Sequence, residues 1–487
     1  MEFAYAGGGL GKGGQVTLYV DGEKVGEGTI PMTQAMIFSA DDGCDVGEDS
    51  GAPVSPDYGS RGNAFNGTVK GVQLCRTGRL PGLTGFQHAD EPDSMGIIGE
   101  PARDRLCSGI RRSYANLLGG ALVMLIRAVV AAALVSIAAS ALAEPENTNW
   151  PNYKEGDFII GDYRFANGQT LPQLKLHYRT LGSAERNAAG EIVNAVLLLQ
   201  GNTGTGANWL RPTLADELFK DGQPLDVRRY FIIIPDALGR GGSSKPADGL
   251  KGNFPHYRYH DMVDVTHRLV TEGLKVAHLR LVIGSSLGCM HSFMWAEMYP
   301  ELMDGIVGLS CQPVEISGRN WIMRRAAAEA IRHDPDWKNG NYDKNPTHYI
   351  YSAAAGSFMP ESAARIQEMA PTRAAADQLY DERVARAAKG DANDSLWAIE
   401  SIEDYSPEAD LPNIKAKVLL INTVEDVANP PELGTVERAM KVIHEGRYVL
   451  IPYSDKTHGH FTHYYAAVWK PYLISFMGTL GPAAAAR

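Results

Sequence analysis

The chain has 487 residues, of which 44% are hydrophobic and 21% charged, and its formal net charge at pH 7 is −11. This composition is typical of a globular protein, and the length indicates more than one domain. The negative charge, with no block of lysine or arginine, argues against a nucleic-acid partner. An odd number of cysteines excludes a complete disulfide framework but allows one bridge. The five cysteines are Cys44, Cys75, Cys107, Cys289 and Cys311.

The first 75 residues alternate short β-like runs with Asp-Gly and Gly-Gly turns, which predicts a small β-rich unit. Residues 15–20 followed by Asp21-Gly22 are typical of a hairpin. The acidic residues between 41 and 49 lack the spacing of an EF-hand, so we expect a solvated loop there. Residues 7–14, 38–43 and 67–72 resemble the C-terminal β-rich end of bacterial arylsulfatases. None of the cysteines opens the Cys/Ser-x-Pro-x-Arg motif of sulfatases, so no sulfatase activity is expected.

Residues 76–123 carry no sustained period and are rich in glycine, arginine and proline, which is typical of a linker. Residues 124–143 then begin with a methionine and an arginine, continue as an apolar run and end in Ala141-Leu142-Ala143. This is the pattern of a secretory signal peptide, with a buried helix or an anchor as the alternative, and the run is shorter than a membrane span. Because a signal peptide begins a protein, we expect Met124 to be the natural start and residues 1–123 to be upstream sequence. The mature protein is then periplasmic or secreted, with no stable membrane span after cleavage.

Residues 144–487 alternate strand-like and helix-like runs, which predicts an α/β domain with a mostly parallel sheet covered by helices on both faces. A leading hairpin precedes the parallel strands. Between about 315 and 405 the pattern is helical without a strand, which predicts a cap, and we expect a homodimer to form through this cap. Strands are predicted at 157–164, 174–180, 194–200, 229–235, 279–283, 304–310, 417–422 and 447–452. Helices are predicted at 214–219, 261–276, 287–299, 324–332, 362–369, 374–388, 431–443 and 461–477.

The stretch from Leu281 to Gly288 ends an apolar run in a Gly-x-Ser-x-Gly pentad, and an amphipathic segment follows. This order is typical of a nucleophile elbow, in which a tight turn between strand and helix holds Ser286 exposed. The glycines at 284 and 288 suit the close backbone approach of such a turn. The alternative is a turn of small residues in a non-catalytic relative. The pattern makes Ser286 the candidate nucleophile.

A serine hydroxyl needs a general base, and the base needs a carboxylate that orients it. The predicted strand after the cap is followed by Glu425-Asp426, and the last predicted strand is followed by three histidines at 458, 460 and 463. Both loops stand where an α/β hydrolase places its acid and its base. The histidines could instead ligate zinc, but they lack the aspartate of the metallo-hydrolase motif and stand near the end of the domain. We therefore expect a Ser-His-Asp arrangement and no metal.

Nearly the whole of 144–487 resembles the homoserine O-acetyltransferase-like branch of the α/β hydrolases. The resemblance implies that Asp426 is the acid and His460 the base. It also implies that Glu425 is a neighbour and that His458 and His463 are wall or surface residues. The matching segments are 283–290, 295–300, 330–337, 340–342, 426–431 and 459–460.

The oxyanion formed on attack needs two N–H donors, commonly one from the residue after the nucleophile and one from a loop after an earlier strand. Leu287 holds the first place. The loop 200–204 holds the second and matches the family's Leu-Thr-Gly, which implies Thr203, with Asn202 as the alternative. A phosphate cradle at 201–206 would need a Gly-Lys-Ser/Thr that does not follow. Cys289 is expected to be a buried core residue rather than a nucleophile.

The resemblance leaves the acyl acceptor open, because one triad can pass an acyl group to water, an alcohol or an amine. Family transferases carry Gly-Gly-Ser-Met-Gly-Gly at the elbow and an Asn-x-Leu-Gly loop with Gly-Ser-Thr-Gly-Pro, whereas this chain has Gly-Ser-Ser-Leu-Gly-Cys and the different loop 236–246. Acetyl-CoA is also a cytoplasmic donor. We therefore expect a serine hydrolase of small-molecule carboxylic esters that needs no cofactor. The alternatives are an acetyl-CoA-dependent acyltransferase and a non-catalytic binding protein on a hydrolase fold.

Overall fold

A computed structural model describes residues 2–5, 14–20, 23–30 and 148–481, and the chain divides into two units, 1–115 and 116–487. In the first unit, β1 (Glu2–Tyr5), β2 (Gly14–Val20) and β3 (Glu23–Ile30) form an antiparallel sheet. Strands β2 and β3 pair as the predicted hairpin requires. The acidic loop, the linker and the signal-like segment 124–143 lie outside the described residues, as does nearly all of the sequence that carries the arylsulfatase resemblance.

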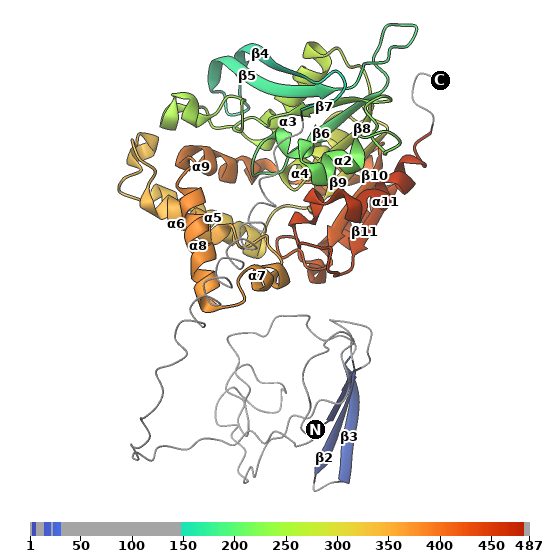
Figure 1. The fold of residues 1–487 in the computed structure, drawn as a ribbon, viewed down its shortest axis with the longest axis vertical. Coiled ribbons are helices and arrows are strands. Elements are labelled where there is room, and N and C mark those ends of the chain that lie inside the picture. Colours follow the sequence, from blue (N-terminus) through green and yellow to red (C-terminus); the bar gives the residue numbers. More distant parts are fainter. Residues whose placement is uncertain (1, 6–13, 21–22, 31–147, 482–487) are drawn as a thin grey trace, which may run out of the picture. The chain divides into compact units, whose positions relative to one another are not determined.

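The second unit is built on one eight-stranded sheet in the order β11-β10-β9-β8-β6-β7-β5-β4 (Figure 1). The predicted leading hairpin is confirmed, because β4 and β5 pair with each other, and β5 with β7, in antiparallel fashion. The remaining neighbours are parallel. Every residue of β6, β8 and β9 is buried, as expected for strands covered on both faces. The strands are β4 (Lys154–Arg164), β5 (Thr170–Leu181), β6 (Ala195–Leu199), β7 (Phe231–Pro235), β8 (Leu279–Ser285), β9 (Gly305–Leu309), β10 (Lys417–Thr423) and β11 (Gly446–Ile451).

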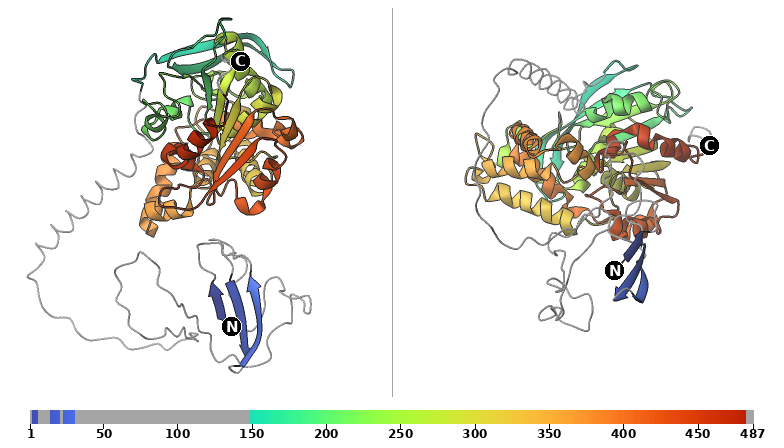
Figure 2. Two further views of the ribbon diagram at one scale, coloured as in Figure 1. Left: turned by 90° about the vertical axis from the view of Figure 1, so that its right-hand side faces the viewer. Right: turned by 60° about the horizontal axis from the view of Figure 1, so that its bottom comes forward.

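Two hydrophobic cores cover the two faces of this sheet, because side chains alternate along a strand. In β6, Val196 and Leu198 join the core against α2 (Pro212–Leu218) and α11 (Ala466–Met477). Leu197 and Leu199 join the opposite core. The helices of that second core are α3 (Tyr259–Arg268), α4 (Leu287–Met298) and α10 (Thr435–Met440). The views in Figure 2 show the sheet with helices on either side. The predicted α/β-hydrolase architecture is confirmed.

The predicted cap is also helical, and it lies between β9 and β10 in sequence. Figure 1 shows its helices grouped beside the sheet. The sequence pattern missed α6 and α9. Helix α6 is rich in alanine and buries only two of its side chains, which leaves no clear apolar period there. The cap helices are α5 (Gly318–Arg332), α6 (Thr347–Gly356), α7 (Ala363–Met369), α8 (Arg373–Ala387) and α9 (Ala392–Glu400).

Three predicted helices are shorter or broken. The helix predicted at 431–443 is a 3₁₀ turn (Pro431–Leu433) and then α10, separated by Gly434, whose φ of +60° no α-helix continues through. The helix predicted at 461–477 is likewise a 3₁₀ turn (Phe461–Tyr464) followed by α11. Helix α3 ends at Arg268 and continues as a π-helical turn, Leu269–Gly273. Among the residues that the structure describes, no helix is both long and apolar enough to cross a membrane.

Candidate active site

Ser286 stands at the sharp turn between β8 and α4. Its φ of 53° and ψ of −111° lie in a region that side-chain-bearing residues rarely adopt. The turn is held by a hydrogen bond from the Ser286 N–H to the Leu309 carbonyl at 2.8 Å. A Cβ at Gly284 would stand 1.9 Å from the Gly288 carbonyl oxygen, and a Cβ at Gly288 2.4 Å from the Leu199 carbonyl oxygen. Only glycine fits at these two positions, which is the geometry predicted for a nucleophile elbow.

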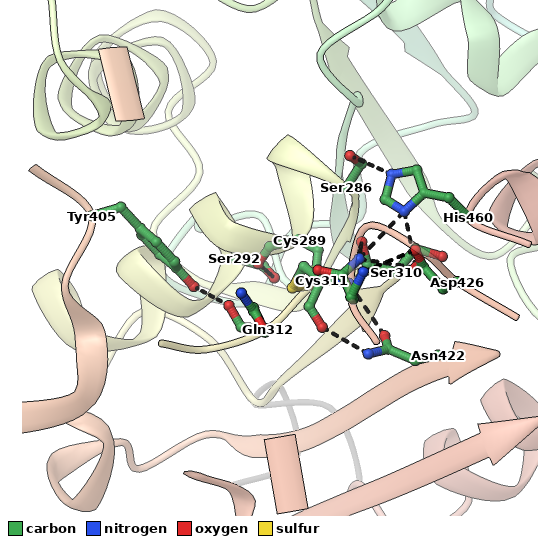
Figure 3. The surroundings of a disulfide bond; sticks show 11 residues. Ser286, Cys289, Ser292, Ser310, Cys311, Gln312, Tyr405, Asn422, Asp426 and His460 are labelled. Carbon is green, nitrogen blue, oxygen red and sulfur yellow. Dashed lines mark hydrogen bonds and ion pairs between the residues drawn. A yellow bond between two sulfur atoms is a disulfide. The ribbon is translucent and has the colours of Figure 1, made fainter. Parts of the chain in front are cut away.

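The structure brings Ser286, His460 and Asp426 together (Figure 3). His460 Nε2 lies 2.9 Å from Ser286 Oγ, and His460 Nδ1 lies 2.9 Å from Asp426 Oδ2. The three residues follow the C-terminal ends of β8, β11 and β10, which meet at one edge of the parallel sheet. Ser286 is partly exposed, whereas His460 and Asp426 are 8% and 1% exposed. The nucleophile therefore faces solvent while its two partners are shielded from it.

The Asp426 carboxylate is stabilised in its ionised form. Burial alone raises the pKa of Asp426, but the adjacent His460 and the hydrogen bonds from Asn429 outweigh it, so that the pKa lies below its ordinary value. An ionised carboxylate can only accept a hydrogen bond, so the proton of the neutral imidazole lies on His460 Nδ1, which donates to Asp426. The lone pair of Nε2 is then directed at Ser286 Oγ, which is the tautomer a general base needs.

Glu425 and the two other histidines of the segment lie around this arrangement. Glu425 faces the cap, where it accepts a hydrogen bond from the Ser362 hydroxyl. His463 Nδ1 donates to the His460 carbonyl at 2.6 Å, and burial together with His460 lowers the pKa of His463 to about 3. His458 stacks on Tyr465 with ring centroids 3.8 Å apart. His463 is 3% exposed and His458 is half-buried, so His463 does not lie at the surface.

The first turn of α4 supplies N–H groups next to the nucleophile. Leu287 is the first helical residue, and the opening N–H groups of a helix have no carbonyl partner within it. The loop 200–204 lies on the other side, because a Cβ at Gly201 would stand 3.5 Å from Ser286 Cβ. Thr203 is exposed and its carbonyl accepts from Asn208 Nδ2 at 2.9 Å. The choice between Thr203 and Asn202 as the second oxyanion donor stays a prediction.

Several residues beside the site gave no clear signal in the sequence. Arg240, in the loop after β7, donates to Asn202 Oδ1 at 3.0 Å. Asn429 donates to Asp426, and its place three residues after the acid and directly before the paired prolines is the one signal that could have identified it. Cys289 is fully buried as expected, but it is not a free core residue, because it forms a disulfide with Cys311. A separation of 22 residues gives no pattern from which this pairing could be predicted.

Comparison with known proteins agrees with this fold. Residues 194–434 match the family model described as alpha/beta hydrolase fold. A probable acyltransferase of Methanothermobacter thermautotrophicus is 25% identical over 322 residues, which cover 66% of this chain and 97% of that protein. The homoserine O-acetyltransferase of Moorella thermoacetica is 36% identical over 194 residues, which cover 36% of this chain and 49% of that protein. The chain thus spans about half the length of that relative.

Solved structures that share the fold include two enzymes. One is the homoserine O-acetyltransferase of Bacillus anthracis, with a TM-score of 0.59 and 20% identity over 68% of this chain and 99% of that one. The other is esterase E22, with a TM-score of 0.58 and 19% identity over 67% of this chain and 100% of that one. The fold and these comparisons define an enzyme of the α/β-hydrolase fold. Its relatives and neighbours include homoserine O-acetyltransferases, a probable acyltransferase and esterases.

Proposed function

We propose that the chain is a serine hydrolase that cleaves small-molecule carboxylic esters, with Ser286 as nucleophile, His460 as general base and Asp426 as the residue that orients the base. The observation that carries this proposal is the continuous hydrogen-bonded arrangement of the three side chains, with 2.9 Å at each step from hydroxyl to imidazole and from imidazole to carboxylate. These distances are within the range in which a proton can pass between heavy atoms.

The reaction needs only protein groups and water. His460 Nε2 takes the proton of Ser286 Oγ as the oxygen bonds to the ester carbonyl carbon, and the imidazolium faces the ionised Asp426. N–H groups of Leu287 and of the loop 200–204 donate to the oxyanion. When this tetrahedral intermediate collapses, the bond between the carbonyl carbon and the leaving oxygen breaks. The leaving oxygen receives the proton from His460. Water then repeats the sequence on the acyl-enzyme and releases the acid and free Ser286.

Hydrolysis of short p-nitrophenyl esters by the wild type and by Ser286→Ala tests the proposal. We expect Ser286→Ala to lose at least about 10³-fold in kcat, because no other group takes over as nucleophile. Ser292→Ala is the matched control, since Ser292 lies on the same helix and its hydroxyl donates to the Cys289 carbonyl inside the core. Activity that survives in Ser286→Ala, or labelling of that variant by a fluorophosphonate probe, would refute the assignment of the nucleophile.

An acyltransferase similar to homoserine O-acetyltransferase is the second candidate, and it is favoured by the relatives. The probable acyltransferase is matched over 97% of its length. Turnover of acetyl-CoA with homoserine that exceeds ester hydrolysis by the same enzyme would establish this function. A non-catalytic binding protein is the third candidate, and it would leave the wild type unlabelled by the fluorophosphonate probe.

We also propose that the enzyme acts in the periplasm or outside the cell after removal of the segment 124–143. The disulfide between Cys289 and Cys311 supports this proposal, because disulfides persist in oxidising compartments and are rare in the cytosol. N-terminal sequencing of the protein isolated from its native host tests it. We expect a mature terminus close to residue 144, and a terminus at residue 1 would refute the proposal.

A homodimer through the cap is the remaining proposal. The observation that supports it is that the cap helices leave several large apolar side chains exposed. Ile322→Asp is expected to lower the mass measured by light scattering from that of a dimer to that of a monomer. Ile474→Asp, at a similarly exposed position on α11, is the control, and a wild type that is monomeric at micromolar concentration would contradict the proposal. The cap residues concerned are Ile322, Met323, Tyr351, Met369 and Tyr380.

A further inference from the structure

Asn429 is the principal partner of the proposed catalytic acid apart from His460. Its side-chain nitrogen donates to Asp426 Oδ2 at 2.9 Å, and its backbone N–H donates to Asp426 Oδ1 at 3.1 Å. Asn429 is 5% exposed. The backbone N–H of Ala428 also donates to Oδ1, at 2.9 Å. Asn429 thus contacts both oxygens of the carboxylate, and together with Ala428 it fixes the rotation of the carboxylate about its Cβ–Cγ bond.

The amide of Asn429 is itself oriented by the main chain after β9. The same nitrogen donates to the Ser310 carbonyl at 3.1 Å. Because the carbonyl of Ser310 and the carboxylate of Asp426 both accept hydrogen bonds, only the NH₂ end of the amide can face them. The side-chain nitrogen of Asn429 thus donates to Ser310 and to Asp426, and it also lies 3.3 Å from His460 Nδ1. The position of the Ser310 carbonyl therefore decides where the amide directs its other hydrogen.

The Ser310–Cys311 segment is fixed from a second strand. Ser310 has a φ of 59°, a conformation that persists only where the surroundings enforce it. Its N–H donates to the Ile421 carbonyl at 2.9 Å. The side chain of Asn422 holds the next residue from both sides, because it accepts from the Cys311 N–H at 3.2 Å and donates to the Cys311 carbonyl at 2.9 Å. Asn422 therefore clamps the residue that follows the carbonyl on which Asn429 depends.

The disulfide connects this segment to the nucleophile. Cys311 is bonded to Cys289, which stands on α4 three residues after Ser286, and the two cysteines are 2% and 0% exposed (Figure 3). A closed path results. It leads from Ser286 along one turn of α4, across the disulfide, through Ser310 and Asn429 to Asp426, and through His460 back to Ser286.

We propose that the Cys289–Cys311 disulfide and Asn429 form a positioning strut that sets the distance between the nucleophile and its acid. The inference rests on the proposed function, because it assumes that Ser286, His460 and Asp426 act together. A strut of this kind makes the active site dependent on the oxidised state of two core cysteines. Reduction by an added dithiol, which transfers two electrons and two protons and yields two thiols, removes the covalent part of the path.

The first test is Asn429→Ala, which leaves the disulfide intact. We expect kcat for p-nitrophenyl esters to fall on the order of 100-fold, because small misplacements of catalytic groups have effects of this size, while KM stays within about twofold. Titration with a fluorophosphonate counts the competent sites, so that kcat refers to folded enzyme. An Asn429→Ala variant with the kcat of the wild type would overturn the proposal.

The second test asks whether the disulfide acts through Asn429. We expect the double variant Cys289→Ala/Cys311→Ala to lose about tenfold in kcat on its own and to cause no further loss in the Asn429→Ala background, whereas the melting temperature falls in both backgrounds. Leu473→Ala, buried in α11 away from the strut, is the control that lowers the melting temperature without changing kcat. Losses in kcat that multiply would show that the disulfide does not act through Asn429, and a disulfide-free enzyme with full kcat would show that the bond serves stability alone. Either result would overturn the proposal.

Reduction of the wild type gives the same information where the cysteine variant does not fold. Thiols are first alkylated without reductant, then dithiothreitol is added, and the new thiols are alkylated and located by mass spectrometry. We expect kcat to fall as Cys289 and Cys311 become labelled and to recover on reoxidation of an unlabelled sample. Full activity with both residues labelled would contradict the proposal. Activity of Ser286→Ala separates the two hypotheses, because its persistence refutes the proposed function itself.

Discussion

Glu297, on the helix that follows the nucleophile, is expected to make the free energy of unfolding depend on pH. It lies near the end of α4, and burial, together with Asp410 and Glu408, raises the pKa of Glu297 from 4.5 to about 8. Its Oε1 is buried and has no hydrogen-bond partner among the described residues. Such a group binds a proton in the folded state at a pH where the unfolded chain has lost it. The free energy of unfolding therefore falls as pH rises from 4.5 to 8 and levels off above that.

The magnitude follows from the two pKa values. A shift from 4.5 to about 8 corresponds to a loss of up to about 5 kcal/mol over this pH range. Glu297→Gln keeps the shape of the side chain but cannot ionise, so its advantage over the wild type is expected to be small at pH 4.5 and several kcal/mol at pH 8.

Urea unfolding of both proteins at half-unit steps between pH 4.5 and 9 measures this difference. Glu301→Gln, at a side chain that is 77% exposed on the following loop, is the control and is expected to change the free energy of unfolding by less than about 1 kcal/mol at every pH. Parallel pH dependences of the wild type and Glu297→Gln would refute the argument.

Three further predictions concern the site itself. Asp426→Asn is expected to lower kcat by about 10⁴-fold with little change in KM, because the amide no longer favours the His460 tautomer with its proton on Nδ1. Steady-state kinetics measure this loss, and a folded variant with unchanged kcat would contradict the prediction. Gly288→Ala places a Cβ 2.4 Å from the Leu199 carbonyl oxygen, so we expect a loss of about 2 kcal/mol or more by urea unfolding, whereas Gly356→Ala, with open space around it, is the tolerated control. Dialysis against EDTA is expected to leave the rate of ester hydrolysis unchanged. A loss of activity that added zinc restores would instead support zinc ligation by the histidines.

The sheet and the nucleophile were predictable because they depend on local patterns. Apolar runs such as 279–283 mark strands that are buried on both faces, and the glycines at 284 and 288 mark the sharp turn. The acid and the base follow from chain order, since parallel strands bring their C-terminal ends to one edge. Chain order thus placed the acid within Glu425-Asp426 and the base among the histidines at 458, 460 and 463. The choice of Asp426 and His460 came from the resemblance to the family pattern.

The supporting residues depend on contacts that no sequence period records. Asn429 and Ser310 lie 119 positions apart, and Cys311 is held by Asn422 at a separation of 111. The breaks at Gly434 and Tyr465 follow from single backbone conformations rather than from apolar periodicity. Patterns along the chain thus predicted where reacting groups emerge from the sheet, whereas the orientation of those groups is determined by pairings across it.

The loop after β7 shows why departures from the transferase pattern do not by themselves decide the acyl acceptor. Asp236 stands where family transferases have asparagine, and it is fully buried. Its carboxylate accepts hydrogen bonds at 2.8 Å from Arg179 and from the N–H groups of Gly206 and Gly242. The aspartate thus anchors the loop against β5, which gives this departure from the transferase pattern a role within the fold. Because the same triad passes the acyl group to whichever nucleophile reaches it, the partition of one acyl-enzyme between water and homoserine is the measurement that separates a hydrolase from a transferase.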